Sequence, residues 1–129
     1  MIVKKVPNPK GGGSKSGRVG GLVNYIAALE VSNGIDHSHG AKNEKCVHFE
    51  TANFVSENLQ TQIKEMAALA TSNVKSKDPI DHWMLSWRSD EKPTVAQARE
   101  AVQIFMKHMK LQGHQVAWGL HEDTDNTHI

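Results

Sequence analysis

The chain has 129 residues, a formal net charge of +1 and a single cysteine. This length fits one domain with a modest hydrophobic core, and the near-neutral charge argues neither for nor against a nucleic-acid partner. The lone Cys46 excludes an intramolecular disulfide and fits a reducing compartment. No apolar run is long enough to span a membrane and no signal peptide begins the chain, so we expect a soluble, cytoplasmic protein.

The N-terminal region is basic. A short strand is predicted over Ile2–Val6, and residues 10–21, rich in Gly, Ser and Lys, are predicted as a flexible loop. Five cations precede the first acidic residue of the chain: Lys4, Lys5, Lys10, Lys15 and Arg18. A basic arm attracts phosphate, so Lys10, Lys15 and Arg18 are candidate contacts to a nucleic-acid backbone. The alternative is an ordinary solvated surface.

A helix is predicted over about Val19–Leu29, because apolar residues recur there at helical spacing. Tyr25 falls at the border of the apolar stripe, where the ring can pack while the hydroxyl reaches solvent. Most tyrosines in such places are ordinary boundary residues. This one is the only tyrosine of the chain, so a tyrosine nucleophile in this fold has no other candidate.

The middle of the chain alternates strands and helices. His37 and His39 fall in a polar stretch that is interpreted as a solvated loop rather than as a metal site. The predicted elements that follow are a strand over Cys46–Phe49, a helix over about Glu57–Val74 capped by Ser56, a strand over His82–Arg88, a helix from a Thr94–Gln97 capping box to Gly113, and a strand over His114–His121.

Two of these strands have informative faces. The strand that ends at Arg88 alternates an aromatic face, interpreted as core, with a polar face from which Arg88 can meet a phosphate. In the last predicted strand, Ala117 and Gly119 precede His121 on one face. Their small side chains predict open space above the sheet, as a bound substrate strand would need.

The last nine residues, His121–Ile129, hold two histidines and three carboxylates. Neutral imidazole is the commonest side-chain metal ligand, so His121 and His128, with Asp123 between them, form a candidate site for a divalent metal. Asp and Asn favour turns. Residues 123–126 are therefore predicted to connect two neighbouring strands on which the histidines face each other. The alternative is a polar turn without a metal.

The stretch His-Glu-Asp-Thr-Asp-Asn-Thr-His-Ile at the C-terminus resembles the third motif of the conjugative and mobilisation relaxases, DNA-nicking enzymes of the HUH endonuclease group. That motif reads His-x-Asp-x4-His-x-His, and this chain ends at Ile129, where one more residue would bring the last histidine. Gly20–Ile26 resembles the first motif, which carries the nucleophilic tyrosine. Ser76 stands in a turn where the second motif has a serine that contacts DNA. The whole chain resembles the N-terminal part of a relaxase domain.

The resemblance implies one incomplete domain over residues 1–129, with an α+β fold: a largely antiparallel central sheet, helices packed against it and the final strand or strands missing. It implies a nick in single-stranded DNA at a plasmid origin of transfer, through a 5′-phosphotyrosyl intermediate on Tyr25. Mg²⁺ or Mn²⁺ held by His121 and His128 would neutralise the scissile phosphate. Asp123 would hold an imidazole N–H or, as the lesser alternative, act as a base. The implied partners, in a bacterial cytoplasm, are relaxosome accessory proteins and a type IV secretion coupling protein.

Two other interpretations stay open. A rolling-circle replication initiator uses the same chemistry, but it usually places its histidine pair before the tyrosine, whereas here Tyr25 comes first. A DNA- or metal-binding module without turnover is the non-enzymatic alternative. Because the third imidazole and most of a central strand are missing, we also expect this chain to be weakly active or inactive, and less stable than a longer form.

Overall fold

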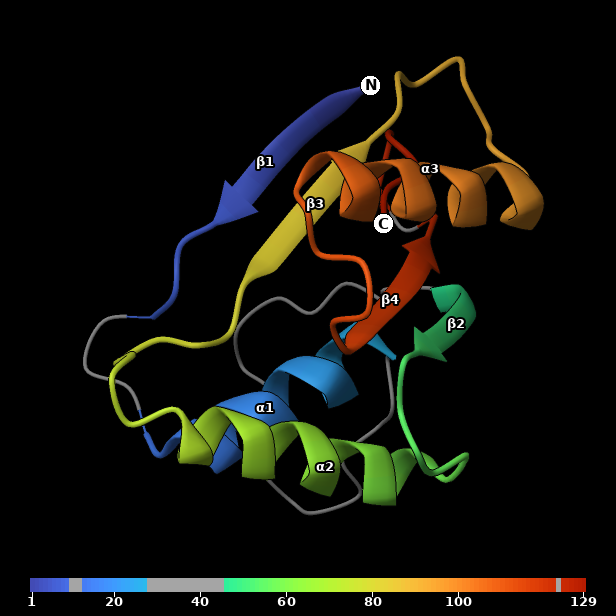
Figure 1. The fold of residues 1–129 in the computed structure, drawn as a ribbon. Coiled ribbons are helices and arrows are strands. Elements are labelled where there is room, and N and C mark those ends of the chain that lie inside the picture. The colour runs from blue at the N-terminus through green and yellow to red at the C-terminus, as the bar shows by residue number, and fades with distance from the viewer. Residues whose placement is uncertain (10–12, 28–45, 123) are drawn as a thin grey trace, which may run out of the picture.

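The computed structural model describes residues 1–9, 13–27, 46–122 and 124–129. Strands and helices alternate along the chain (Figure 1). The elements are β1 (Ile2–Val6), α1 (Lys15–Ile26), β2 (Cys46–Ala52), α2 (Leu59–Ser72), β3 (His82–Ser86), α3 (Val95–His108) and β4 (Val116–His121). This is the order of elements that the sequence predicts.

The strands form two antiparallel pairs, β1 with β3 and β2 with β4. The C-terminal residues 127–129 lie between the two pairs. On one side the amide of Trp87 donates to the carbonyl of Thr127 at 2.9 Å. On the other side His121 and His128 exchange both backbone hydrogen bonds, at 2.8 and 3.1 Å. The predicted antiparallel sheet is confirmed, and residues 127–129 bridge its two strand pairs.

Two separate cores show that helices cover both faces of the sheet (Figure 1). α1 and α2 enclose a core around the buried Val19 and Ala70, and Ala117 of β4 packs against it. α3 encloses the second core, in which Ala98 lies with Trp118 of β4. Neighbouring residues of a strand point to opposite faces, so Ala117 and Trp118 mark the two sides. The predicted α+β architecture is therefore confirmed.

Helix α1 begins earlier than the sequence predicts. It starts at Lys15 rather than at Val19, so the predicted loop over residues 10–21 is helical from Lys15 onward. Ser14 caps the helix, because its Oγ accepts a hydrogen bond from the amide of Gly17 at 3.1 Å. Val19 is completely buried. Its packing stabilises a helix in a segment whose glycines disfavour one.

The ends of α2 and α3 follow local hydrogen bonding. The cap of α2 is Asn58 rather than Ser56, since the Asn58 side chain accepts the amide of Thr61 at 3.2 Å. The predicted capping box of α3 is confirmed. This helix ends at His108, before Gly113, because Lys110 adopts a left-handed φ of 56° that closes a Schellman turn.

The remaining boundaries differ from prediction by two or three residues. β2 extends to Ala52, α2 ends at Ser72, β3 ends at Ser86 and β4 begins at Val116. Ends of elements depend on a few local hydrogen bonds that composition does not specify. Within the described ranges, none of the helices has the length and apolar character needed to cross a membrane.

Candidate nucleophile and histidine site

The structure brings His121 and His128 together. His121 is the last residue of β4, and His128 pairs with it on the C-terminal segment. Their ring centroids are 5.3 Å apart and the ring planes differ by 15°. The two side chains that the sequence predicts as metal ligands are therefore neighbours on one face of the sheet, although their role as ligands stays a prediction.

The ring of His121 is held by a backbone carbonyl of α1. Its Nε2 lies 2.9 Å from the carbonyl oxygen of Ile26. A carbonyl oxygen can only accept, so Nε2 carries the hydrogen and the neutral ring keeps its lone pair at Nδ1. Only 5% of His121 is exposed, and its Nδ1 is buried without a partner among the described residues. A histidine that binds a metal usually donates its second ring nitrogen to a carboxylate or a backbone carbonyl, and the Nε2 of His121 has such a carbonyl partner.

A cavity of about 170 Å³ joins the histidines to Tyr25. Its lining includes Tyr25 at the end of α1, both histidines and His82 at the start of β3. Tyr25 is 54% exposed, so its ring borders both the cavity and solvent. The chain's only tyrosine and the two motif histidines thus line one cavity that opens to solvent, although 96 residues separate Tyr25 from His121 in the sequence.

His82 also lines this cavity, and no motif in the sequence points to it. It is partly buried, and this burial lowers its pKa from the ordinary value of 6.5. The ring is therefore neutral over a wider pH range than a solvated histidine. The one sequence signal for it is the alternation of β3, which sets His82 opposite the aromatic face.

The donor chemistry of this site fits a metal ion, with two imidazole donors among the described residues. His121 and His128 supply imidazole nitrogens from adjacent strands, and the buried Nδ1 of His121 has a lone pair available to an electrophile. Because the rings are nearly parallel, one of them must rotate before both lone pairs can meet on one ion. The parts of the chain that the structure describes hold no cluster of three His, Cys, Asp or Glu side chains. Asp123 lies outside those parts.

The space above Gly119 is not open, contrary to the sequence-based expectation. A Cβ placed on Gly119 would lie 2.6 Å from the carbonyl oxygen of Ile26. The end of α1 therefore rests directly on β4. Ala117, two residues earlier, packs against the core between α1 and α2. The small side chains of Ala117 and Gly119 therefore make room for the end of α1 and leave no space for a substrate strand.

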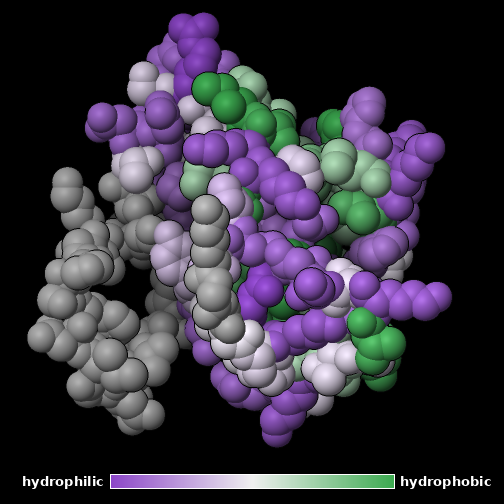
Figure 2. Space-filling model, turned by 90° about the vertical axis from the view of Figure 1, so that its left-hand side faces the viewer, coloured by the Kyte–Doolittle hydropathy of each residue, from purple (hydrophilic) through white to green (hydrophobic). Residues whose placement is uncertain are grey.

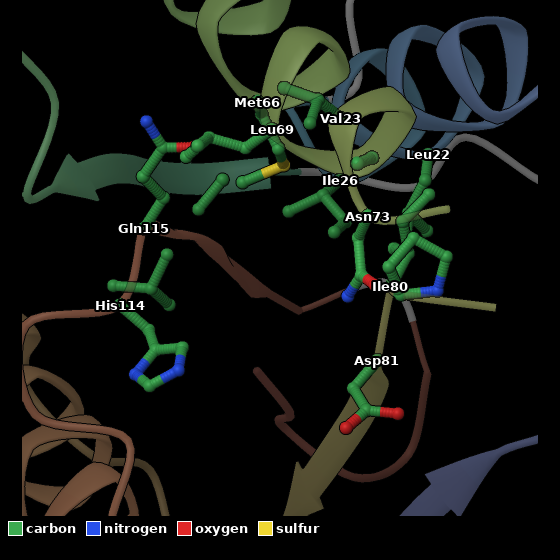
Figure 3. A pocket seen from close by; sticks show the side chains of 14 residues that line it. Leu22, Val23, Ile26, Met66, Leu69, Asn73, Ile80, Asp81, His114 and Gln115 are labelled. Carbon is green, nitrogen blue, oxygen red and sulfur yellow. The ribbon is translucent and has the colours of Figure 1, made fainter. Parts of the chain in front are cut away.

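A second cavity, of about 300 Å³, lies beside the contact of α1 with β4 and is lined largely by apolar side chains (Figure 3). Leu22 and Ile26 of α1 and Met66 of α2 face it, Gln115 lies beside Met66, and His114 and Asp81 lie on the opposite side. Ile26 thus lines this apolar cavity as well as holding His121.

The predicted phosphate contacts on α1 are engaged within the protein. Arg18 forms an ion pair with Asp78 at 2.5 Å, and Lys15 donates to the carbonyl of Asn73 at 2.7 Å. Only 18% of the Arg18 side chain is exposed. Both cations therefore hold the turn between α2 and β3, and Lys10 lies outside the described residues.

Ser76 and Arg88 do not line the histidine cavity. Ser76 sits in the turn held by Arg18, at the opposite end of α1 from Tyr25, and its Oγ accepts the amide of Asp78 at 3.2 Å. Arg88 follows β3 and is exposed, and its Nε forms an ion pair with Asp90 at 3.3 Å.

On the face shown in Figure 2, hydrophilic side chains form most of the surface, with separate apolar areas between them.

Comparison with known proteins assigns the family. Residues 31–129 match the family described as "Relaxase: MobA/VirD2-like, nuclease domain". The chain belongs to this relaxase family. The match includes both motif histidines and His82, and Tyr25 precedes it. Relaxases are generally metal-dependent, which agrees with the donor chemistry of the histidine pair.

Two curated relatives extend the match. Protein MobA of Acidithiobacillus ferrooxidans is 50% identical over 64 residues, which cover 50% of this chain and 16% of the relative. Protein TraI of Escherichia coli is 30% identical over 130 residues, which cover 100% of this chain and 16% of the relative. This relaxase chain therefore spans about a sixth of the length of either relative. No solved structure gives a significant match.

Proposed function

We propose that this domain nicks one strand of DNA at a plasmid origin of transfer, with Tyr25 as the nucleophile. The observation that carries the proposal is the cavity shared by Tyr25, His121 and His128. Membership of the relaxase nuclease family supports the reaction class. Accessory proteins of the relaxosome and a type IV coupling protein are the partners that the family resemblance suggests.

The reaction is a transesterification. The Tyr25 phenol loses its proton, and its oxygen attacks the scissile phosphorus. The bond from phosphorus to the 3′ oxygen breaks, and this oxygen takes up a proton. The products are a 5′-phosphotyrosyl DNA end on the protein and a free 3′-hydroxyl on the other fragment. The number of phosphoester bonds is conserved, so the step needs no redox partner.

The histidine pair would place a positive charge next to the scissile phosphate. His121 and His128 would hold a divalent ion, most simply Mg²⁺ or Mn²⁺ as the sequence suggests. When bound, the ion supplies positive charge that neutralises the scissile phosphate. The carbonyl of Ile26 keeps the His121 ring in one orientation. Asp123, placed between the two histidines in the motif, would add a further acceptor for an imidazole N–H.

An assay for a single covalent turnover tests this proposal most directly, because it follows formation of the protein–DNA adduct itself rather than repeated cleavage.

Tyr25→Phe tests the proposal. Single-stranded oligonucleotides that tile the origin of transfer are labelled at the 3′ end, because the downstream fragment stays on the tyrosine. The native chain with Mn²⁺ should form a labelled protein adduct that survives denaturation. The Tyr25→Phe chain should bind the same DNA with similar affinity and form no adduct. Equal adduct in both chains would show that another residue is the nucleophile, and binding without adduct in the native chain would favour the non-catalytic alternative.

A further inference from the structure

The end of α1 meets β4 through two close approaches of one residue, Ile26. Its carbonyl oxygen accepts Nε2–H of His121 at 2.9 Å. The same oxygen lies where a Cβ on Gly119 would come within 2.6 Å of it. Ile26 also lines the apolar cavity beside Leu22 and Met66 (Figure 3). The last turn of α1 is therefore held to β4 through the Ile26 carbonyl, while the Ile26 side chain borders an apolar cavity.

We propose that Gly119 and the His121–Ile26 hydrogen bond position the nucleophile Tyr25 over the histidine pair. Ile26 follows Tyr25 directly, so the carbonyl that binds the ring of His121, a predicted metal ligand, belongs to the residue next to the tyrosine. This inference rests on the proposed function and adds two positioning groups to it: a glycine, and a backbone carbonyl.

Gly119 acts because a Cβ at this position would come within 2.6 Å of the Ile26 carbonyl oxygen and within 2.9 Å of Nε2 of His121, the two atoms that form the hydrogen bond. A flexible side chain could swing away from an added methyl group, but the carbonyl of Ile26 belongs to the end of a helix. A side chain at position 119 must displace that end, and Tyr25 moves with it. The same displacement breaks the hydrogen bond that orients His121, so one methyl group disturbs both sides of the reaction centre. Misplacement of reacting groups by about 1 Å can cost about a hundredfold in rate.

The test compares Gly119→Ala with Gly13→Ala. The control adds the same methyl group at a position where nothing lies within 4 Å of the new Cβ. We expect Gly119→Ala to slow adduct formation on single-stranded DNA by about ten- to a hundredfold while DNA affinity stays within about twofold. Gly13→Ala should leave the rate unchanged. Equal rates in the two variants would overturn the inference.

A second readout follows the position of Tyr25 without DNA. The chain has one tyrosine, so incorporation of 3-fluorotyrosine gives one ¹⁹F resonance. Gly119→Ala should shift this resonance, and Gly13→Ala should not. In the native protein, ¹⁵N spectra of the histidine rings should show His121 with its proton on Nε2. A proton on Nδ1 would overturn the inference even if Gly119→Ala failed to fold.

These measurements separate the inference from the proposed function. If the native chain formed no adduct, the proposed function would fail while the ¹⁹F and ¹⁵N measurements still tested the contact of α1 with β4. If the native chain formed the adduct and Gly119→Ala matched Gly13→Ala in rate and in resonance, the positioning role would fail and the proposed function would stand.

Discussion

The two ends of α1 contact the rest of the protein in different ways. At the C-terminal end, Tyr25 lines the histidine cavity and the carbonyl of Ile26 holds His121. At the N-terminal end, Lys15 and Arg18 hold the turn between α2 and β3. The C-terminal end places the proposed nucleophile beside the histidine pair. At the other end, Arg18 pairs with Asp78 and Lys15 bonds the backbone carbonyl of Asn73, and contact of these cations with DNA stays a prediction.

The largest effect is expected from His121→Ala, because it removes a predicted metal ligand and the partner of Ile26 together. Calorimetric titration of the native chain with Mn²⁺ should show binding at neutral pH that weakens toward about pH 5, since protonated imidazole cannot coordinate. The variant should lose this binding, and adduct formation should fall by about a hundredfold or more.

The control is His108→Ala, since His108 is exposed at the end of α3. It should keep both metal binding and adduct formation. Metal affinity that did not change in His121→Ala would show that the histidine pair does not bind the ion.

A moderate effect is expected at the other end of α1. Changing Lys10, Lys15 and Arg18 to Gln should weaken single-strand DNA binding and flatten its salt dependence, by roughly 0.7 in log–log slope for each phosphate that the protein no longer neutralises. Asp78→Asn serves as the partner experiment, because it breaks the ion pair and keeps every cation.

The two variants distinguish a structural role from a DNA-binding role. If the cations serve DNA, only the triple change alters the salt slope, and Asp78→Asn lowers the melting temperature. A slope left unchanged by the triple change would show that Lys15 and Arg18 serve the fold alone.

The smallest effect is expected from His82→Asn. Burial lowers the pKa of His82 below its usual 6.5, so the unfolded chain takes up a proton at a higher pH than the folded chain does. As pH falls through about 6.5 the unfolded state therefore gains stability relative to the native state. The native chain should lose free energy of unfolding between pH 7 and 5, and His82→Asn should lose less. Identical pH profiles in urea denaturation would show that His82 is solvated in the native state.

Local patterns predict much of this fold. The alternation of residues 82–88 and 114–121 predicts β3 and β4, and the Thr94–Gln97 capping box predicts the start of α3. The start of α1 escapes prediction because burial of Val19 stabilises a helix where glycines disfavour one. Such a tertiary contact has no signature in the local sequence.

The site divides in the same way. Side chains with distinctive chemistry, Tyr25, His121 and His128, can be predicted from composition and motif spacing. The groups that hold these side chains in place cannot be predicted in this way. The carbonyl of Ile26 is a backbone atom that any residue would supply, and Gly119 has a role only because the end of α1 rests on it. Long-range packing decides both.

Mapping the attachment point of DNA tests the central claim most directly. The adduct with single-stranded origin DNA is digested with nuclease and trypsin, and the peptides are identified by mass spectrometry. We predict a nucleotide linked through its 5′ phosphate to the peptide of residues 19–42, with the linkage at Tyr25. A nucleotide attached to a serine or a histidine, or adduct formation that persists in Tyr25→Phe, would contradict Tyr25 as the nucleophile.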